Sequence, residues 1–218
     1  MKRCCAWIAL IAVAAAATVF TSSEPVRATH GMVVSQEAVA SKIGVGVLRA
    51  GGTAVDAAVA TAFALAVVYP TAGNIGGGGF IVFRPATGDP VAYDFREKAP
   101  AAATPTMFLT DGKYDAVRHH GSHLSVGVPG TVAGLHLAWK AHGKLPWKRL
   151  VEPAIALAQG GFPLTDALAS SLARVLPSMK AYPASVAQFS KNGVPYEPGE
   201  VLAQPDLART LARIAEAG

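Results

Sequence analysis

Cysteine is nearly absent from this sequence, and neither of its two cysteines lies where a folded domain is expected. Cys4 and Cys5 both fall in an apolar run close to the N-terminus. A structural disulfide or a thiolate metal site needs further cysteines in the folded part of the chain. The sequence therefore excludes both a disulfide framework and a cysteine-based metal site.

The first 28 residues have the pattern of a secretory signal peptide. Lys2 and Arg3 precede the 17-residue apolar run 4–20, and small residues surround the expected cleavage point after Ala28. An uncleaved anchor is the alternative, because 17 apolar residues are close to the lower limit for crossing a bilayer. Either alternative predicts export, to the periplasm or outside the cell. Cleavage would leave residues 29–218 without a stable membrane span.

Features of nucleic-acid binding are also scarce. The formal net charge is +5, but the basic residues are scattered and are not interleaved with aromatic residues. We therefore predict no nucleic-acid partner. With 51% hydrophobic residues, segment 29–218 is long enough to form one domain with a sizeable core.

Two helices are predicted in the first third of the chain. The first has Ser35 as its expected N-cap and residues 39, 43 and 47 on its buried face. The second opens with the capping-box spacing of Thr53 and Asp56, continues through residues 57–69 and stops at Pro70. Because this second helix is apolar on every side, we expect it at the centre of the core.

A glycine run at 76–79 leads into a predicted β-hairpin made of residues 80–83 and 91–95. The two-residue period of the second strand places Val91, Tyr93 and Phe95 on the inward face, with Asp94 and Arg96 on the other. Helical patterns recur from about residue 130 onward. The predicted fold class is α+β, helix-rich with a hairpin whose open edges need partner strands from outside this chain.

The glycine run does not have the features of a nucleotide-binding loop. No Lys-Ser/Thr pair follows it, and the predicted order is helix, glycines, strand, which is the reverse of a phosphate-binding loop. Glycines also allow a very close approach of the backbone, either in a loop that lines a pocket or in a packed turn. The residue types favour neither of these two alternatives.

Three histidines, His119, His120 and His123, could bind a metal. However, no carboxylate pattern accompanies them and adjacent histidines usually point apart, so we favour an exposed loop and predict no metal site. Ser122 and Ser125 lie near these histidines, but the sequence has no Gly-x-Ser-x-Gly nucleophile turn. No catalytic nucleophile is predicted in this chain.

Asp94-Phe95-Arg96-Glu97 is the remaining candidate site. An arginine held by neighbouring carboxylates can bind a substrate carboxylate through two parallel hydrogen bonds. An ordinary surface salt-bridge cluster is the alternative, and the charge pattern alone favours it.

Four segments, 51–60, 70–80, 94–100 and 127–134, occur in an order and at a spacing that resemble the γ-glutamyltranspeptidase family. The resemblance covers residues 29–218 and corresponds to the N-terminal part of the family's large subunit. It implies an N-terminal-nucleophile hydrolase with an αββα sandwich, made as a precursor that cuts itself into a large and a small subunit, without a cofactor. A threonine of the small subunit attacks the γ-glutamyl bond of glutathione, and water, an amino acid or a peptide then receives the γ-glutamyl group.

The same resemblance implies that Arg96 binds the α-carboxylate of the γ-glutamyl substrate, with Asp94 and Glu97 in supporting positions. It places the nucleophile beyond Gly218, so we expect these 218 residues alone to be inactive. Two alternatives remain. The chain could be an inactive remnant or a binding domain, or it could belong with relatives that act on cephalosporin side chains or poly-γ-glutamate.

Overall fold

The computed structural model describes residues 25–217, so the predicted signal segment, including Cys4 and Cys5, lies almost wholly outside the described residues. The chain divides at Met32 into two units. Residues 25–32 of the first contain no helix or strand, and all described elements belong to the second. Within residues 25–217, no helix combines the length and apolar character needed to cross a membrane.

The core is built around helix α3 (Ala54–Val68). Its capping box is formed as predicted: the Asp56 backbone N–H donates to Thr53 Oγ1 at 3.1 Å, and the Thr53 N–H donates to Asp56 Oδ2 at 2.8 Å. Of its 15 residues, 11 are buried, which confirms the prediction of a helix at the centre of the core. It is not buried on every side as predicted, because Ala54 and Ala58 are exposed and Ala62 and Leu65 are half-buried along one strip.

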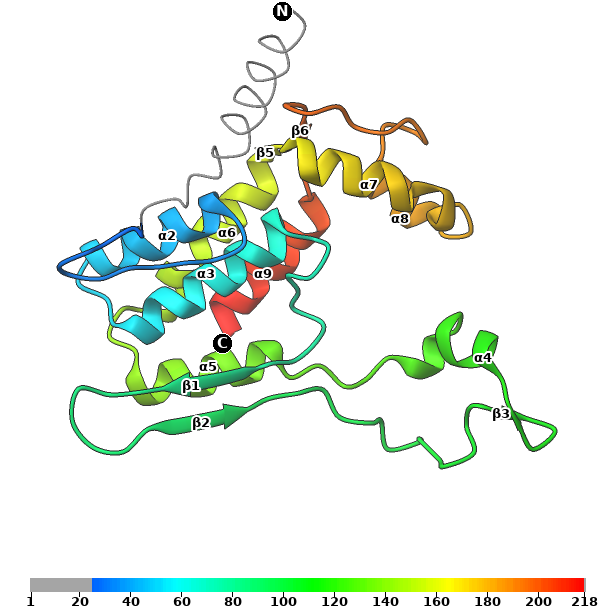
Figure 1. The fold of residues 1–218 in the computed structure, drawn as a ribbon, viewed down its shortest axis with the longest axis horizontal. Coiled ribbons are helices and arrows are strands. Elements are labelled where there is room, and N and C mark those ends of the chain that lie inside the picture. Colours follow the sequence, from blue (N-terminus) through cyan, green and yellow to red (C-terminus); the bar gives the residue numbers. More distant parts are fainter. Residues whose placement is uncertain (1–24, 218) are drawn as a thin grey trace, which may run out of the picture. The chain divides into compact units, whose positions relative to one another are not determined.

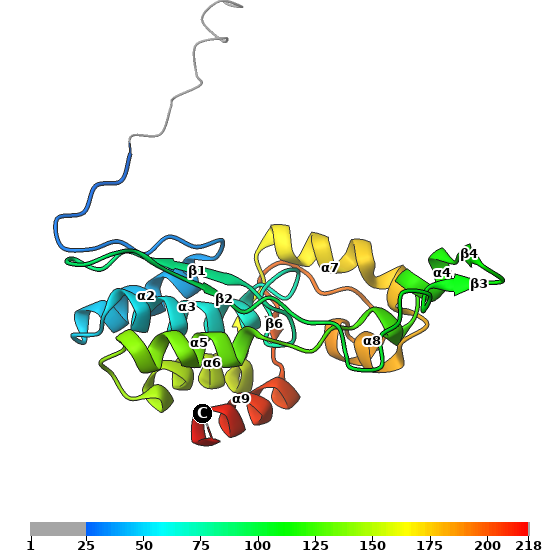
Figure 2. The same ribbon diagram turned by 90° about the horizontal axis from the view of Figure 1, so that it is seen from below.

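Helices pack around α3 from several directions (Figures 1 and 2). Contacts join α3 to α2, α5 and α6, and α6 packs in turn against α9. The helices other than α3 are α2 (Ala38–Arg49), α4 (Ala116–His120), α5 (Thr131–His142), α6 (Trp147–Gly160), α7 (Asp166–Met179), α8 (Pro183–Phe189) and α9 (Pro205–Ala217), with a 3-10 turn η1 (His123–Ser125).

The start of α2 differs from the prediction. Ser35 does not cap the helix, because its hydroxyl donates to the backbone oxygen of Glu37, and Glu37 occupies the N-cap position. The buried face contains Ala40 and Gly44 together with Val47, whereas Val39 is exposed. The reason is close helix packing: a Cβ atom at residue 44 would overlap the side chain of Thr61 in α3.

The predicted hairpin is confirmed as strands β1 (Phe80–Phe83) and β2 (Val91–Asp94), paired antiparallel with Phe80 opposite Asp94. It lies along α5, and the Tyr93 hydroxyl is 2.7 Å from His142 Nε2. The opposite face is open, with Phe80 63% and Val82 79% exposed.

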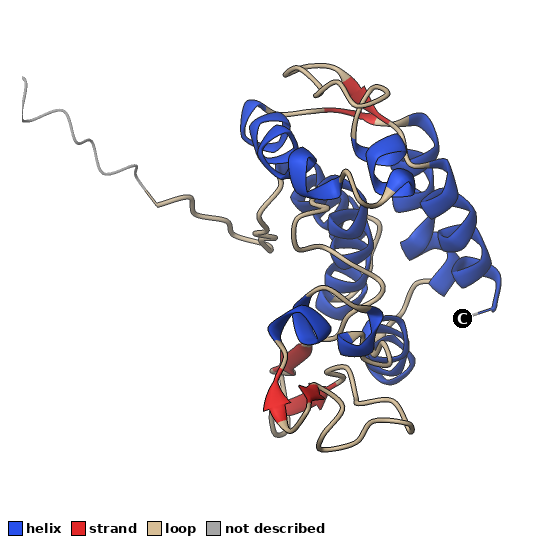
Figure 3. Ribbon diagram, turned by 90° about the vertical axis from the view of Figure 1, so that its right-hand side faces the viewer, coloured by secondary structure: helices blue, strands red, loops and turns tan. Residues whose placement is uncertain are grey.

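Two further strand pairs are short, and helices predominate over strands (Figure 3). The predicted α+β class is therefore confirmed. The pairs are β3 (Leu109–Thr110) with β4 (Lys113–Tyr114), and β5 (Phe162–Pro163) with β6 (Val201–Leu202). Neither pair was predicted, because two-residue strands carry too little pattern to be recognised.

Candidate functional site

Arg96 directly follows the hairpin, and the backbone on either side of it is held by two other segments. The Phe95 N–H donates to the Gly79 oxygen at 3.0 Å. Lys98 and Val128 exchange a pair of backbone hydrogen bonds at 3.2 and 2.7 Å. Segment 95–98 therefore lies between the glycine run and the segment that leads into α5.

These two holding segments are also bonded to each other. The Gly77 oxygen accepts from the N–H groups of Gly130 and Thr131, at 2.8 and 3.1 Å. The Asn74 side-chain oxygen accepts from the Gly77 N–H at 2.7 Å and from the Thr131 hydroxyl at 3.2 Å. One framework around Arg96 is thus formed by three of the four segments that resemble a known family, namely 70–80, 94–100 and 127–134.

Gly78 is where this framework touches Arg96 most closely. A Cβ atom at residue 78 would lie 2.5 Å from the Glu97 nitrogen and 2.6 Å from the Arg96 Cα. Real Cβ atoms do not approach a backbone so closely. Of the two roles that the sequence left open for the glycine run, close backbone packing is therefore the one that Gly78 fulfils.

The side chain of Arg96 is far less constrained than its backbone. It is 70% exposed, and its Nε lies 3.9 Å from Glu97 Oε1, a distance typical of a loose ion pair. Asp94 Oδ1 accepts from the backbone N–H of Arg96, at 3.0 Å. Asp94 thus fixes the turn after β2, and the donors of the guanidinium remain accessible to a ligand.

A cleft of about 290 Å³ opens beside Arg96. Arg96 and Glu97 line it together with residues of segment 103–127, among which Met107, Phe108 and Leu124 are apolar. Such a cleft can accept a small molecule whose anionic end pairs with the guanidinium and whose remainder contacts hydrocarbon.

The two serines considered as nucleophiles have other partners. The Ser122 hydroxyl donates to the Arg118 backbone oxygen, and the Ser125 hydroxyl donates to the Ser122 backbone oxygen at 3.3 Å. Over the range 25–217, neither hydroxyl is hydrogen-bonded to a histidine. The geometry therefore provides no Ser/His pair at this cleft.

The adjacent histidines do not point apart, contrary to the assumption behind the prediction of an ordinary exposed loop. The ring centroids of His119 and His120 are 4.2 Å apart, and one nitrogen of each ring contacts the Tyr114 hydroxyl. The β3–β4 turn brings Tyr114 back over the short helix α4, a contact that the one-dimensional pattern could not show. No group of three His, Cys, Asp or Glu side chains suited to a metal occurs in the described part of the chain.

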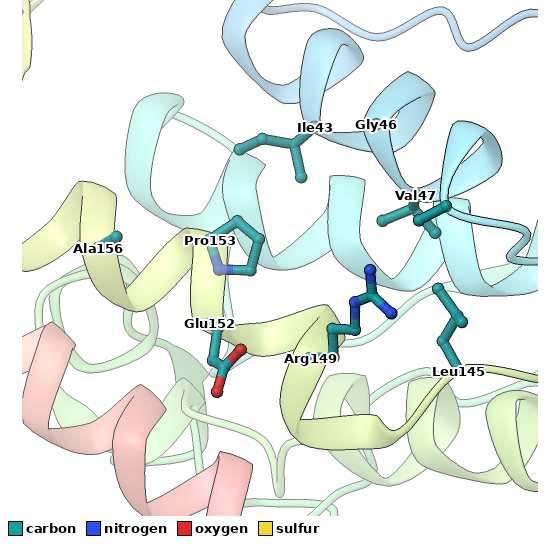
Figure 4. Close-up of a pocket in the computed structure, with 9 residues that line it drawn as sticks. Ile43, Gly46, Val47, Leu145, Arg149, Glu152, Pro153 and Ala156 are labelled. Atoms are coloured by element: carbon teal, nitrogen blue, oxygen red, sulfur yellow. The ribbon is translucent and has the colours of Figure 1, made fainter.

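A second hollow, of about 510 Å³, lies between α2 and α6 (Figure 4). Arg149 extends toward α2 and Glu152 points away from it, while the walls are largely hydrocarbon from Ile43, Val47 and Pro153. No serine, threonine, cysteine or histidine is among its lining residues. It shares no residue with the Arg96 cleft, which remains the candidate site.

The fold and the site together define a helix-rich α+β protein that presents one accessible arginine from a rigid turn beside a small cleft. Comparison with known proteins makes the assignment specific, since residues 40–218 match the family model described as Gamma-glutamyltranspeptidase. This chain belongs to the γ-glutamyltranspeptidase family.

Several relatives and solved structures agree with this assignment. The chain is 49% identical to the glutathione hydrolase proenzyme of Escherichia coli (strain K12), covering 89% of this chain and 34% of that protein. It is 46% identical to the glutathione hydrolase proenzyme of Pseudomonas sp. (strain A14), covering 96% and 38%. The crystal structure of Helicobacter pylori γ-glutamyltranspeptidase matches with a TM-score of 0.86 at 44% identity, over 89% of this chain and 56% of that one. The chain thus spans little more than a third of the length of these curated relatives.

Proposed function

We propose that this chain supplies the carboxylate-binding arginine of an enzyme that hydrolyses or transfers γ-glutamyl groups, with glutathione and other γ-glutamyl compounds as substrates. The observation that carries the proposal is the geometry of Arg96. Its backbone is held by two segments, whereas its side chain is 70% exposed and lines the cleft. A rigid support and an accessible fork are what bidentate recognition of a carboxylate requires.

Arg96 would bind the α-carboxylate of the γ-glutamyl group, with Asp94 and Glu97 supporting it in different ways. Asp94 fixes the backbone of Arg96 through its 3.0 Å hydrogen bond. Glu97 lies 3.9 Å from the guanidinium and limits its range of positions without occupying both of its edges. The planar guanidinium can then form two parallel hydrogen bonds, which the point charge of a lysine cannot.

The nucleophile, in this proposal, comes from a small subunit cut from the same precursor. Both E. coli and Pseudomonas relatives are named proenzymes, and this chain covers about a third of each. The outward face of the hairpin supports a partner, because Phe80 and Val82 are exposed and the edges of β1 and β2 have no further strand among residues 25–217. Open edges of this kind need partner strands.

It follows that these 218 residues alone should not turn over a γ-glutamyl anilide, and no cofactor is proposed. The test compares the purified chain with its Arg96→Ala variant. Turnover by the unmodified chain above the rate of the variant would contradict this part of the proposal. We also propose export to the periplasm or the cell exterior, which predicts a secreted protein whose N-terminus is residue 29.

Replacement of Arg96 in the complete, self-processing protein tests the central proposal. Loss of a charge-assisted bidentate contact is worth about 1.5–3 kcal/mol, so Arg96→Ala and Arg96→Lys should both raise KM roughly tenfold or more. Cleavage of the precursor should continue, because the contact is made only with substrate. Arg84→Ala is a matched control, since Arg84 is an exposed hairpin residue outside the cleft. An unchanged KM would remove Arg96 from the site.

Substrate choice within the superfamily needs a separate comparison. A cephalosporin acylase from Bacillus halodurans is 29% identical to this chain with a TM-score of 0.74, and the transpeptidase CapD of Bacillus anthracis is 34% identical with a TM-score of 0.72. Glutathione offers an α-amino acid end, whereas a glutaryl amide does not. Dependence on Arg96 for glutathione, together with weak turnover of glutaryl amides, would support the γ-glutamyl assignment.

A further inference from the structure

Three side chains converge on one point next to α4, and one of them, His119, also lines the Arg96 cleft. Tyr114 Oη lies 2.8 Å from His119 Nδ1 and 3.1 Å from His120 Nε2. A tyrosine hydroxyl has one proton, so it can donate to one ring and accept from the other. We propose that Tyr114, His119 and His120 form a binding site for a divalent transition-metal ion, with Cu²⁺ preferred. The residues, and not the proposed γ-glutamyl activity, carry this inference.

The local fold places the three donors together. Asp111 and Gly112 adopt positive φ angles, 51° and 75°, and thereby form the tight turn between β3 and β4. Asp115 then caps α4, with Oδ1 accepting from the Arg118 N–H at 2.9 Å and Oδ2 accepting from the Thr110 hydroxyl at 2.8 Å. The hairpin and the helix are thus joined at Asp115, directly beside Tyr114, so the donor atoms are brought together before any ion binds.

The chemistry of the donor set suits a transition metal. Imidazole nitrogen is a ligand for Zn²⁺, Cu²⁺ and Ni²⁺, and affinity among these ions is generally highest for Cu²⁺. Binding would form bonds from the ion to two ring nitrogens and to the phenol oxygen, whose proton passes to solvent. Both carboxylate oxygens of Asp115 accept hydrogen bonds, so this acid is engaged in the cap.

The donor spacing is short enough for one ion to contact the phenol oxygen together with either ring nitrogen. For an ion about 2.0–2.1 Å from each donor, separations of 2.8 and 3.1 Å subtend roughly 85–100°. Each ring has to rotate so that its lone pair points at the ion, so the preference for Cu²⁺ rests on the ligand types and not on these separations.

The surroundings leave room for an ion and hold one ring in place. Tyr114 is 59% exposed and His120 is also exposed, so water can occupy the remaining positions around the metal. His119 is half-buried, and its ring packs on Phe108 with centroids 4.2 Å apart. The site is therefore open to solvent on one side and anchored on the other.

The test is a titration of the full chain with CuCl₂, followed by calorimetry, electron paramagnetic resonance and visible absorption. We expect the chain to bind one equivalent of Cu²⁺. The electron paramagnetic resonance spectrum should be typical of tetragonal Cu²⁺, and the visible spectrum should contain a phenolate-to-copper charge-transfer band. Loss of a second-shell partner already weakens metal sites about 10–100-fold, so His119→Ala or His120→Ala should raise Kd by at least about tenfold. Tyr114→Phe should abolish the charge-transfer band while leaving nitrogen coordination. ZnCl₂ should bind more weakly than CuCl₂.

His123→Ala and His136→Ala are the matched controls, because neither residue is hydrogen-bonded to Tyr114 among residues 25–217. Both should leave Kd unchanged. The proposal is overturned if no copper binds, or if His119→Ala and His120→Ala bind copper as tightly as the unmodified chain. It is also overturned if the two control variants lose as much copper affinity as the His119→Ala and His120→Ala variants. Thermal melts of all variants identify any that fail to fold, and the Tyr114→Phe spectrum then decides the matter, since this variant removes a single exposed hydroxyl.

Discussion

Gly78 packs directly against the backbone of Arg96, so closely that a Cβ atom on residue 78 would lie 2.6 Å from the Arg96 Cα. The accessible arginine of the cleft is therefore positioned by a residue that has no side chain. The neighbouring Gly76 offers a contrast, because a Cβ atom there would meet nothing within 4 Å.

We expect Gly78→Ala to destabilise the protein by about 1–3 kcal/mol, the usual cost of forcing extra volume into a packed region. The neighbours are backbone atoms of Arg96 and Glu97, which cannot rotate away as a side chain could. Denaturant unfolding measures the change. Gly76→Ala should be neutral within about 0.5 kcal/mol, as expected for a substitution without new contacts. Equal effects of the two substitutions would show that the close approach at Gly78 is not maintained in solution.

Asp56 joins two parts of the core that are far apart in the sequence. Its buried carboxylate accepts from the Thr53 N–H within the capping box, and also from the N–H groups of Lys144 and Leu145 in the connection between α5 and α6. Asp56→Ala leaves three amide donors without this acceptor. Each buried amide that loses its acceptor costs about 1–3 kcal/mol, so the free energy of unfolding should fall by roughly 3 kcal/mol or more. Asp56→Asn, which keeps one oxygen, should lose less.

Asp166 provides the control for this experiment, since it occupies the first turn of α7 but is exposed. Asp166→Ala removes only a favourable interaction with the helix dipole, worth about 0.3–1 kcal/mol. Comparable losses of unfolding free energy for Asp56→Ala and Asp166→Ala would mean that the contacts to residues 144 and 145 contribute nothing.

Glu200 should make stability depend on pH in the acidic range. The Glu197 backbone N–H and the Lys191 ammonium hold the pKa of the Glu200 carboxyl below its ordinary value of 4.5. A lowered pKa in the folded state means that the stabilisation is present above pH 4.5 and is lost as the pH falls through the folded-state pKa. Glu200→Gln should therefore lower Tm at pH 7, and the difference should shrink progressively below pH 4.5.

Glu197→Gln is the matched substitution, because it is Glu197's backbone, and not its side chain, that bonds Glu200. Its Tm difference from the unmodified protein should be small and nearly independent of pH in the same range. If the Tm difference between Glu200→Gln and the unmodified protein stays constant down to pH 3, the effect of the substitution is steric and not electrostatic.

Local pattern was sufficient for some features whose residues are neighbours in the sequence, but not for all of them. The capping box of Thr53 and Asp56, the stop at Pro70 and the inward face of Tyr93 all follow from interactions within a few residues, and they are present as predicted. The predicted start of α2 was wrong because the Ser35 hydroxyl donates to the Glu37 backbone oxygen. The predicted buried face was wrong because small residues pack against Thr61.

What the sequence by itself determined is the family and its local elements: a central helix apolar on every side, a hairpin, and an arginine next to acids in a recognisable order of motifs. Tertiary structure alone decided what these elements do for one another. Asn74, Gly77 and Thr131 meet around the Arg96 segment, and Tyr114 folds back onto His119 and His120. Such contacts join separate turns of the chain, and their geometry depends on how the backbone packs, which no pattern of neighbouring residues specifies.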